Sequence, residues 1–489
     1  MNAKNNVSLE IADWAHGLTL ESIPPRVVEE AKNQLLSVIA AIHAGHFSEA
    51  GRVISRTVKD WSQSKNATLI PSGEKTSTHA AIFANAALSM TLLYDDALLG
   101  AHLGASSVTV ALALAEQLGS SGGDLLVAQI IANEVGGRIG LVALTDPLGD
   151  YRTPAAHRVG AALAAAKLRN LTAAQTFSAM AMAIQDPGMG IRASFVGSDA
   201  KILSAAMAAP AGVQAAELAE NGLVAQGDPI GGASGYLDMV GRPGAGTAFR
   251  TLGEIWLTET LSYSGYPCAP HVAGSIDCIV ALLRQHNIDG RKVDKVEVTV
   301  GPDAVEIDQE AHDQFAGADT NPSSLSFSIR YCVAATLLDK EFSPRQLTRD
   351  RIRDEAVWEL ANRVEVGADP TMDSVLRDRS LRRQVERGVQ TGFDVGRLDM
   401  RGARAGLATK VRITLKNERF FETQRDAPTG CGAGPFDDRV KTVEDKFRRE
   451  TRYTLRKERM EKSIDLIHHL ERGTPANVKE IIRCVCSER

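Results

Sequence analysis

The sequence predicts a mainly α-helical protein in which a large all-helical domain is combined with a smaller α+β domain. Alanine fills long stretches such as 155–166 and 205–216, whereas only 5% of the residues are aromatic. Alanine has the highest intrinsic helix propensity, and it allows helices to approach each other closely. Alternation of apolar and polar residues, the period of a half-buried strand, begins only near residue 290. A chain of 489 residues, 44% of them hydrophobic, is long enough for two or three domains.

The first helices follow from local signals. Residues 7–20 have an amphipathic pattern. Pro24-Pro25 predicts the start of a second helix, because the N–H that proline lacks has no partner in a first turn. From 78 to 220, Ala- and Leu-rich segments follow one another, and segment 106–118 begins at a serine suited to cap a helix. Their wide apolar faces predict a bundle that is mostly buried.

The smaller domain is expected where the period changes from helix to strand. Strand patterns cover 293–300, 361–368 and 408–422, the last with a hairpin turn at Lys416-Asn417-Glu418. Helical segments are expected between them, at 324–338, 344–348 and 372–389. After residue 435 the chain returns to helix. We therefore expect a discontinuous helical domain formed by 1–265 and 425–489, and an α+β domain formed by 266–424.

Charge and cysteine content limit the classes of partner and the cellular compartment that we expect. A net charge of −5 provides no field that would capture nucleic acid, and we interpret the mixed-charge stretch 439–462 as one solvated helix face. The sequence starts without an apolar signal segment, and no apolar run approaches the roughly 18 residues of a membrane span. The six cysteines are scattered, as is typical of a reducing compartment. We expect a cytoplasmic protein without nucleic-acid or membrane partners.

Several segments, taken together and in order, resemble the MmgE/PrpD family. Four of them are YDDALLGAHLGASSVTVALALAEQL, YRTPAAHRVGAALAAAKL, GSDAKILSAAMAAPAGVQAAELAENG and GYPCAPHVAGSID. Farther along the chain, NPSSLSFSIRYCVA and VEDKFR also resemble segments of this family. The resemblance spans most of the chain. It implies a large all-helical domain, a smaller α+β lid and a homodimer.

The resemblance also implies an enzyme that acts on a small di- or tricarboxylate by removing a proton next to a carboxylate. Such a reaction needs a base close to that carbon, and cationic or hydrogen-bonding groups that hold the developing charge. The sequence contains no GxGxxG after a strand, no Walker loop, no HExxH and no paired CxxC. We therefore expect no nucleotide, flavin or metal, and chemistry without a cofactor.

Two residues are kept at positions to which the resemblance assigns catalysis, His102 and Lys201. His102 lies in the small-residue loop Gly-Ala-His-Leu-Gly before a helix, where a side chain stays accessible. Lys201 directly precedes an Ala-rich helix, where a cation is unfavourable unless an anion occupies the same place. We expect His102 to transfer a proton, and Lys201 to bind a carboxylate and take part in proton transfer. The alternatives are an ordinary loop histidine and a solvated lysine.

The family's second catalytic histidine falls on Tyr151 or, with a slip of one residue, on Arg152. A tyrosine can donate or relay a proton, but its ordinary pKa of about 10 makes it a poor base at neutral pH. We expect Tyr151 to be catalytic and Arg152 to bind substrate. Thr153 matches a family threonine and is expected to hold this loop beside the substrate. His157, deeper in the following helix, is expected to be structural.

Other positions of the family pattern differ in this sequence. The acidic turn at 93–97 loses its first acid and its threonine but keeps Asp96, a candidate for substrate binding. Ser264 stands where the family has a lysine before Gly-Tyr-Pro, and it too is a candidate for substrate binding. His271 lies two positions before the place of a missing histidine and is a candidate to replace it.

Arg192 and Arg330 lie near matched segments and are candidates to supply the positive charge that these changes remove. We expect a lyase of the dehydratase or decarboxylase kind. An epimerase of the iminodisuccinate epimerase type is the alternative, because His102 with Lys201 or Tyr151 could place a proton donor on each face of one carbon. A carboxylate-binding protein without catalysis is the third interpretation. The sequence leaves the substrate and the choice among these reactions open.

Overall fold

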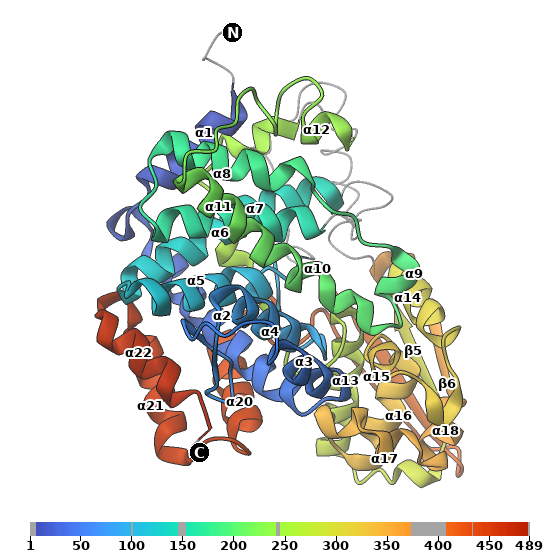
Figure 1. Cartoon of the computed structure of the whole chain (residues 1–489). Coiled ribbons are helices and arrows are strands. Elements are labelled where there is room, and N and C mark those ends of the chain that lie inside the picture. Colours follow the sequence, from blue (N-terminus) through green and yellow to red (C-terminus); the bar gives the residue numbers. More distant parts are fainter. Residues whose placement is uncertain are drawn as a thin grey trace.

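The computed structural model describes residues 6–98, 101–144, 153–240, 245–372, 407–432 and 434–487. Within these ranges the chain forms a large helical body and a smaller α+β lid, which lies at the lower right of Figure 1. The mainly helical fold with a small α+β part is therefore as the sequence predicts.

The body contains helices from both ends of the chain. Its N-terminal part consists of α1 (Val7–Gly17), α2 (Pro25–His46), α3 (Glu49–Val58), α4 (Thr78–Met90), α5 (Gly104–Leu118), α6 (Gly122–Leu144), α7 (Thr153–Leu168), α8 (Ala173–Gln185), α9 (Arg192–Phe195), α10 (Leu203–Ala206), α11 (Ala208–Glu220) and α12 (Tyr236–Met239). Its C-terminal part consists of α20 (Phe436–Thr451), α21 (Lys457–His468) and α22 (Pro475–Cys484). Figure 1 shows red α20 beside blue α2, against which it packs.

The alanine-rich helices of the body approach each other closely because small residues face each other. A Cβ atom added to Gly212 of α11 would lie 2.2 Å from the carbonyl oxygen of Arg158 in α7. The segment Asp199–Glu220 is long and apolar enough in composition to cross a membrane, but 56% of its most apolar window is buried inside the protein. Residues 199–220 therefore pack partly inside the body, with one side exposed.

The lid is a four-stranded sheet covered by helices. Its strands, in the order β6–β5–β7–β8, are β6 (Val364–Ala368), β5 (Val293–Val300), β7 (Thr409–Leu415) and β8 (Phe420–Arg425). Strands β5 and β6 are parallel, and the other pairs are antiparallel. Its helices are α13 (Pro270–Gln285), α14 (Pro302–His312), α15 (Pro322–Leu325), α16 (Ile329–Asp339), α17 (Arg349–Ile352) and α18 (Glu355–Ala361), and α13 packs on β7 and β8. The period-2 pattern thus predicts all three strand regions and the turn after Leu415.

Three local predictions are wrong. Ser106 does not cap a helix, because α5 begins at Gly104 and the Ser106 hydroxyl instead contacts the Leu103 carbonyl and His157. The segment 324–338 is two helices, α15 and α16, separated by a turn capped by Ser328. The stretch 439–462 is not one solvated face, because Arg439 and Lys446 are buried. The helix expected at 372–389 lies outside the described residues from 373 onward.

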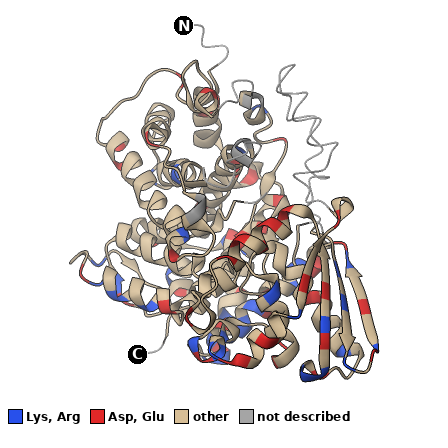
Figure 2. Cartoon of the chain, turned by 90° about the vertical axis from the view of Figure 1, so that its right-hand side faces the viewer, with Lys and Arg blue, Asp and Glu red and all other residues tan. Residues whose placement is uncertain are grey.

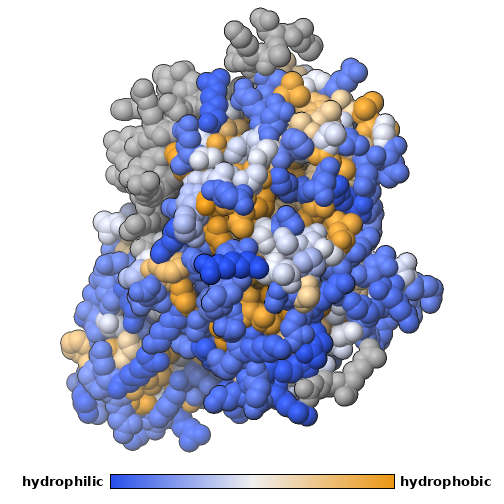
Figure 3. All heavy atoms as spheres, turned by 90° about the vertical axis from the view of Figure 1, so that its left-hand side faces the viewer, coloured by the Kyte–Doolittle hydropathy of each residue, from blue (hydrophilic) through white to orange (hydrophobic). Residues whose placement is uncertain are grey.

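Two large hydrophobic cores are present. One joins the N-terminal helices with residues 443–486, and the other fills the lid between α13, α16 and the sheet. Charged residues gather on the lid and the adjoining part of the body in Figure 2, whereas the upper body carries few. On the opposite side, Figure 3 shows apolar side chains reaching the surface among hydrophilic ones. The domain boundaries predicted above stay predictions.

A short strand pair of the body lies where the chain crosses into the lid. Strand β3 (Asp96–Ala97) pairs with β4 (Ser262–Tyr263), so that Asp96 lies opposite Tyr263. This pairing places the turn before His102 directly beside the segment through which the chain crosses into the lid. The candidate active site lies at this junction.

Candidate active site

His102 is held by the acidic turn that precedes it. Its Nδ1 lies 3.1 Å from Asp95 Oδ1 and 2.8 Å from the Asp96 carbonyl oxygen. Both neighbours accept hydrogen bonds, so Nδ1 carries a proton and donates it. The side chain is 15% exposed, and its Nε2 has no hydrogen-bond partner among the described residues. Nε2 is therefore the ring atom available to a substrate.

The charge of His102 is set by its carboxylate neighbours. Burial alone would lower the pKa of the imidazole, but the charge and hydrogen bond of Asp95, together with Asp96, outweigh it and raise this pKa to about 9. At neutral pH the ring is thus an imidazolium. It is suited to give a proton away and not to take one up.

Asp96 lies beneath the loop and supports it. Its Oδ2 accepts hydrogen bonds from Gln34 at 2.8 Å and from the Gly104 amide at 3.3 Å. Burial and the Asp95 charge raise the pKa of this carboxyl to about 7. Any Cβ at Gly104 would lie 2.0 Å from Asp96 Oδ1, so only glycine lets α5 start this close to the acid. The structure buries Asp96, which was expected to bind substrate.

A buried lysine from the other end of the chain fixes the same turn. Lys446 of α20 donates hydrogen bonds to the carbonyl of Tyr94, to that of Asp95 at 3.5 Å, and to the Ser37 hydroxyl at 2.9 Å. Burial lowers its pKa to about 7, although Asp95, Asp96 and Glu450 oppose this shift. Lys446 therefore determines the backbone position from which Asp95 reaches His102.

Lys201 is buried without a hydrogen-bond partner. It lies in a single 3-10 turn, Asp199–Ile202, and is 1% exposed. Its Nζ makes no hydrogen bond with any described residue and lies 5.1 Å from the centre of the Phe327 ring. Burial lowers its pKa to about 7, while the charges of Asp199 and Asp95 act to raise it. The charge of Asp95 thus acts on both Lys201 and His102.

The lid closes over the lysine turn through a serine-rich loop. Ser323 donates a hydrogen bond to Asp199 Oδ1 at 2.7 Å, and Ser324 donates one to the Gly197 carbonyl at 2.9 Å. Phe327 follows in this loop and contacts both Lys201 and His271. The site is therefore built from body and lid together.

His271 belongs to the lid wall of the site. Its Nε2 bonds to the Phe327 carbonyl at 2.9 Å, and its ring stacks on the Phe327 ring with centroids 6.5 Å apart. Burial lowers its pKa to about 4, so this ring is neutral at neutral pH. A neutral histidine that donates from Nε2 keeps Nδ1 as a hydrogen-bond acceptor.

Comparison with known proteins identifies the family. The MmgE/PrpD N-terminal domain matches residues 9–245, and the MmgE/PrpD C-terminal domain matches residues 266–472. The chain belongs to the MmgE/PrpD family. The resemblance stated from the sequence is thereby confirmed.

Curated relatives of this MmgE/PrpD protein are fungal. Cis-aconitate decarboxylase of Aspergillus terreus is 25% identical over 478 residues, which cover 91% of this chain and 93% of the relative. A cis-aconitate decarboxylase-like protein of Aspergillus oryzae is 25% identical over 384 residues, 74% of this chain and 79% of the relative. Family and relatives together support an enzyme of the dehydratase or decarboxylase type that acts on carboxylates.

The remaining residues predicted for the site of this MmgE/PrpD protein are placed as follows. Ser264 lies beside the acidic turn, because its amide donates to the Asp95 carbonyl at 3.5 Å and its hydroxyl to the Tyr266 carbonyl at 2.6 Å. Thr153 is buried at the start of α7. Arg330 forms an ion pair with buried Asp308 inside the lid, so its charge is already matched.

Three residues predicted for the site have side chains outside the described part of the chain. Tyr151 and Arg152 lie outside the described residues, and so does the side chain of Arg192, whose backbone begins α9.

His157 is buried against Ser106 at 2.8 Å, and burial together with the nearby His102 charge lowers its pKa to about 3. This is a structural environment, as the sequence suggests. Among the described residues no group of three or more His, Cys, Asp or Glu side chains forms a candidate metal site.

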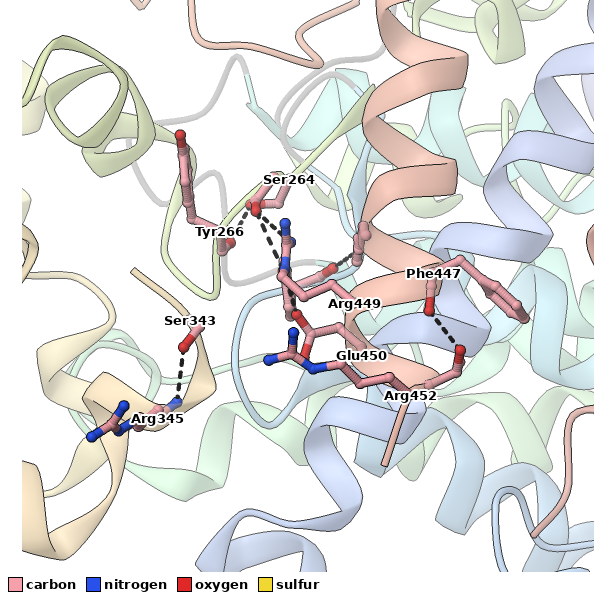
Figure 4. A network of polar contacts seen from close by, with 12 residues as sticks. Ser264, Tyr266, Ser343, Arg345, Phe447, Arg449, Glu450 and Arg452 are labelled. Atoms are coloured by element: carbon pink, nitrogen blue, oxygen red, sulfur yellow. Dashed lines mark hydrogen bonds and ion pairs between the residues drawn. The ribbon is translucent and has the colours of Figure 1, made fainter. Parts of the chain in front are cut away.

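Sequence reasoning missed the polar network of α20. Arg449 bonds to Glu450 at 2.8 Å, to the Gly265 carbonyl at 2.9 Å and to the Tyr94 hydroxyl, and Glu450 accepts from Tyr94 at 2.9 Å. Figure 4 shows Arg449 and Glu450 next to the segment that carries Ser264 and Tyr266. The VEDKFR segment was the available signal, because it holds Lys446 and resembles family text.

Proposed function

We propose that this protein is a lyase acting on a small di- or tricarboxylate, with His102 as the proton donor and Lys201 as a carboxylate ligand. The observation that carries the proposal is the His102–Asp95 pair, which keeps the imidazole protonated at neutral pH while Nε2 stays free. A lyase of either kind uses such an acid. In decarboxylation it protonates the carbon that loses CO2, and in dehydration it protonates the departing hydroxide.

Lys201 fits the second role because its charge has no partner in the protein. A buried ammonium without hydrogen bonds is costly, and a carboxylate placed beside it would remove that cost. Such an anion would also raise the lysine pKa above about 7, so that substrate binding and protonation of Lys201 would support each other. Neutral His271 on the lid side offers a ring nitrogen that can accept a hydrogen bond from substrate.

We favour decarboxylation for this site. The bond between carbon and one carboxyl group breaks, its electron pair stays on the substrate as CO2 leaves, and the His102 Nε2 proton is transferred to that carbon. The ring regains a proton from water before the next cycle. The proposal rests on the acidic state of His102 and on relatives named cis-aconitate decarboxylase. No proton has to be abstracted by the imidazolium in this sequence of steps.

An epimerase is the second candidate, supported by the lowered pKa of Lys201. A neutral fraction of Lys201 near pH 7 can remove an α-proton while His102 returns one on the other face of the carbon. Dehydration would use the same pair, with hydroxide leaving in place of proton return. The two reactions differ from decarboxylation in requiring a base.

Incubation in deuterated water, followed by 1H and 13C NMR, separates the candidates. The substrates are cis-aconitate, citrate, 2-methylcitrate and iminodisuccinate. We expect release of CO2 and one deuterium at the carbon that lost it, and we expect His102→Asn to slow turnover at least about 100-fold, as loss of a general acid does. His469→Asn, at an exposed histidine, is the control. Deuterium exchange in a substrate of unchanged formula would show an epimerase, and absence of turnover with all four would contradict the proposal.

A further inference from the structure

A cavity of about 360 Å³ lies in the lid, along α13 and away from His102 and Lys201. It is bounded by the last turns of α13 on one side, and by the end of β8 with the following loop on the other. Pockets of about 300 Å³ and larger are of the size that takes a small molecule. Neither His102, Lys201 nor His271 lines it, so it is separate from the candidate active site.

Two arginines from different elements line this cavity. Arg284 comes from the last turn of α13, and Arg425 is the last residue of β8. Within the residues that the structure describes, neither guanidinium forms an ion pair or a side-chain hydrogen bond. Two positive charges that share a cavity repel each other, and an anion between them would relieve the repulsion. Gln285 adds an amide to the same wall.

The acid in the cavity offsets only part of these charges, and it is directed away from the accessible surface. Both oxygens of Asp277 are already engaged, one by the Tyr266 hydroxyl at 2.9 Å and the other by the Thr429 amide at 2.7 Å. Asp277 is 5% exposed, whereas Arg284 and Arg425 are exposed. The accessible part of the lining is therefore positive.

We propose that this cavity is a second anion site, which binds a small molecule with two or more acidic groups between Arg284 and Arg425. Guanidinium groups pair with carboxylate and phosphate alike, so the shared chemistry is that of a compact polyanion. The site goes beyond the proposed reaction and does not depend on it.

Its position couples it to His102 by a short path. Tyr266, at one end of the cavity, accepts a hydrogen bond from Ser264 through its carbonyl, and the Ser264 amide bonds to the carbonyl of Asp95, which holds His102. Figure 4 shows Ser264 and Tyr266 together on this segment. An anion that moves Tyr266 would therefore change the support of the catalytic imidazole, so the site has the placement of a regulatory one.

Calorimetric titration of the full chain tests the site with two probes, citrate and pyrophosphate. We expect at least one probe to bind a protein in which His102→Asn and Lys201→Met have disabled the candidate active site. Adding Arg284→Gln and Arg425→Gln should weaken that binding at least about tenfold, as expected for the loss of charge-assisted hydrogen bonds. The preferred probe distinguishes a carboxylate ligand from a phosphate one.

The matched control is Arg291→Gln, at an exposed arginine of the lid outside the cavity. It should change the dissociation constant by less than about twofold, because general electrostatic attraction from one surface charge is small. The proposal is overturned if neither probe binds, or if the cavity variant binds as well as the control variant. Thermal melts of each variant show that loss of binding is not loss of fold. Because binding is read directly, failure here is independent of whether the protein proves to be a lyase.

Discussion

Asp95 sets the charge of two side chains at the residue scale. Its carboxylate raises the pKa of His102 and acts in the same direction on Lys201, yet the two cations differ. His102 contacts Asp95 directly and is protonated at neutral pH. Lys201 has no hydrogen-bond partner among the described residues, and its pKa lies near neutral pH. Asp95 therefore dominates the proton affinity of His102, whereas burial dominates that of Lys201, and the proposed acid–base chemistry would use this difference.

Removing the Asp95 charge should lower the pKa of His102. In Asp95→Asn we expect this pKa to fall from about 9 toward the ordinary value of about 6.5, because burial is then opposed by Asp96 alone. Activity above about pH 7 should be lost and partly recovered at lower pH. NMR titration of labelled histidine rings measures the pKa. Asp350→Asn, at an exposed acid of α17, should leave it unchanged, and an unchanged pKa in Asp95→Asn would refute the assignment.

Lys201 and Lys446 are a matched pair for stability. Both are buried with a pKa lowered to about 7, but only Lys446 has oxygen partners. We expect Lys201→Met to stabilise the protein by about 1–2 kcal/mol, because an unpartnered charge leaves the core. Lys446→Met should destabilise it by about 3 kcal/mol, since carbonyls lose their donor. Denaturant unfolding gives both values, and a loss of stability in Lys201→Met would contradict the account.

The pH dependence of the Lys201 effect has a definite sign. The folded pKa of Lys201, about 7, lies below its ordinary value of 10.5, so burial of the charge destabilises the folded protein fully below pH 7. This destabilisation decreases as pH rises from about 7 to 10.5, where the folded lysine is already neutral. The advantage of Lys201→Met over wild type should therefore be largest at pH 7 or below and shrink above it. Unfolding free energies measured from pH 6 to about 10 test this.

Helix contacts decide stability at the element scale. The contact of α7 with α11 requires glycine, because a Cβ on Gly212 would also lie 2.8 Å from the Cβ of Ala161. We expect Gly212→Ala to destabilise the protein by about 1–3 kcal/mol through overpacking, despite the better helix propensity of alanine. Gly17→Ala, where an added Cβ meets nothing within 4 Å, is the control and should be neutral. Thermal or urea unfolding compares the two variants. Equal stabilities would show that the contact between α7 and α11 adjusts to the added methyl group.

Elements were predictable from the sequence where their pattern is local. The alternation in 293–300 marks β5 to the residue, because one face of that strand is buried and the other is not. The prediction that Ser106 caps a helix is wrong because its hydroxyl, inside α5, forms a tertiary hydrogen bond with His157. In the candidate site, His102 and Lys201 were predicted from motifs that resemble those of the family. The role of Lys446 was not, although VEDKFR resembles a family segment, because the carbonyls that this lysine meets come from residues 94 and 95, far away in the sequence.

The whole molecule has an apolar stripe that suits a second copy of the chain. Leu203, Met207 and Leu218 are 43%, 61% and 51% exposed, and their spacing along α10 and α11 places them on one side. Exposed apolar surface of this kind marks interaction sites, and we propose that it forms the interface of a homodimer. The cytoplasmic location suggested by the cysteines stays a prediction.

Light scattering after size exclusion tests the homodimer. We expect wild type to have twice the chain mass of 52.3 kDa, and Met207→Glu with Leu218→Glu to shift it to the monomer, because charges at a dry interface are costly. Phe420→Glu, at an exposed lid residue, should remain dimeric. A monomeric wild type would refute the proposal, and an unchanged mass in the double variant would place the interface elsewhere.

The contact of α20 with the acidic turn also bears on how the protein is made. Lys446 fixes the turn at Tyr94 and Asp95, so a chain still on the ribosome has the loop of His102 long before it has the residue that holds this loop. N-terminal helices can collapse early during synthesis. Correct alignment of the imidazole must nevertheless wait until α20 has been synthesised. A nascent or truncated chain that lacks α20 would thus carry His102 and Lys201 but not the contact that fixes the turn beside the imidazole.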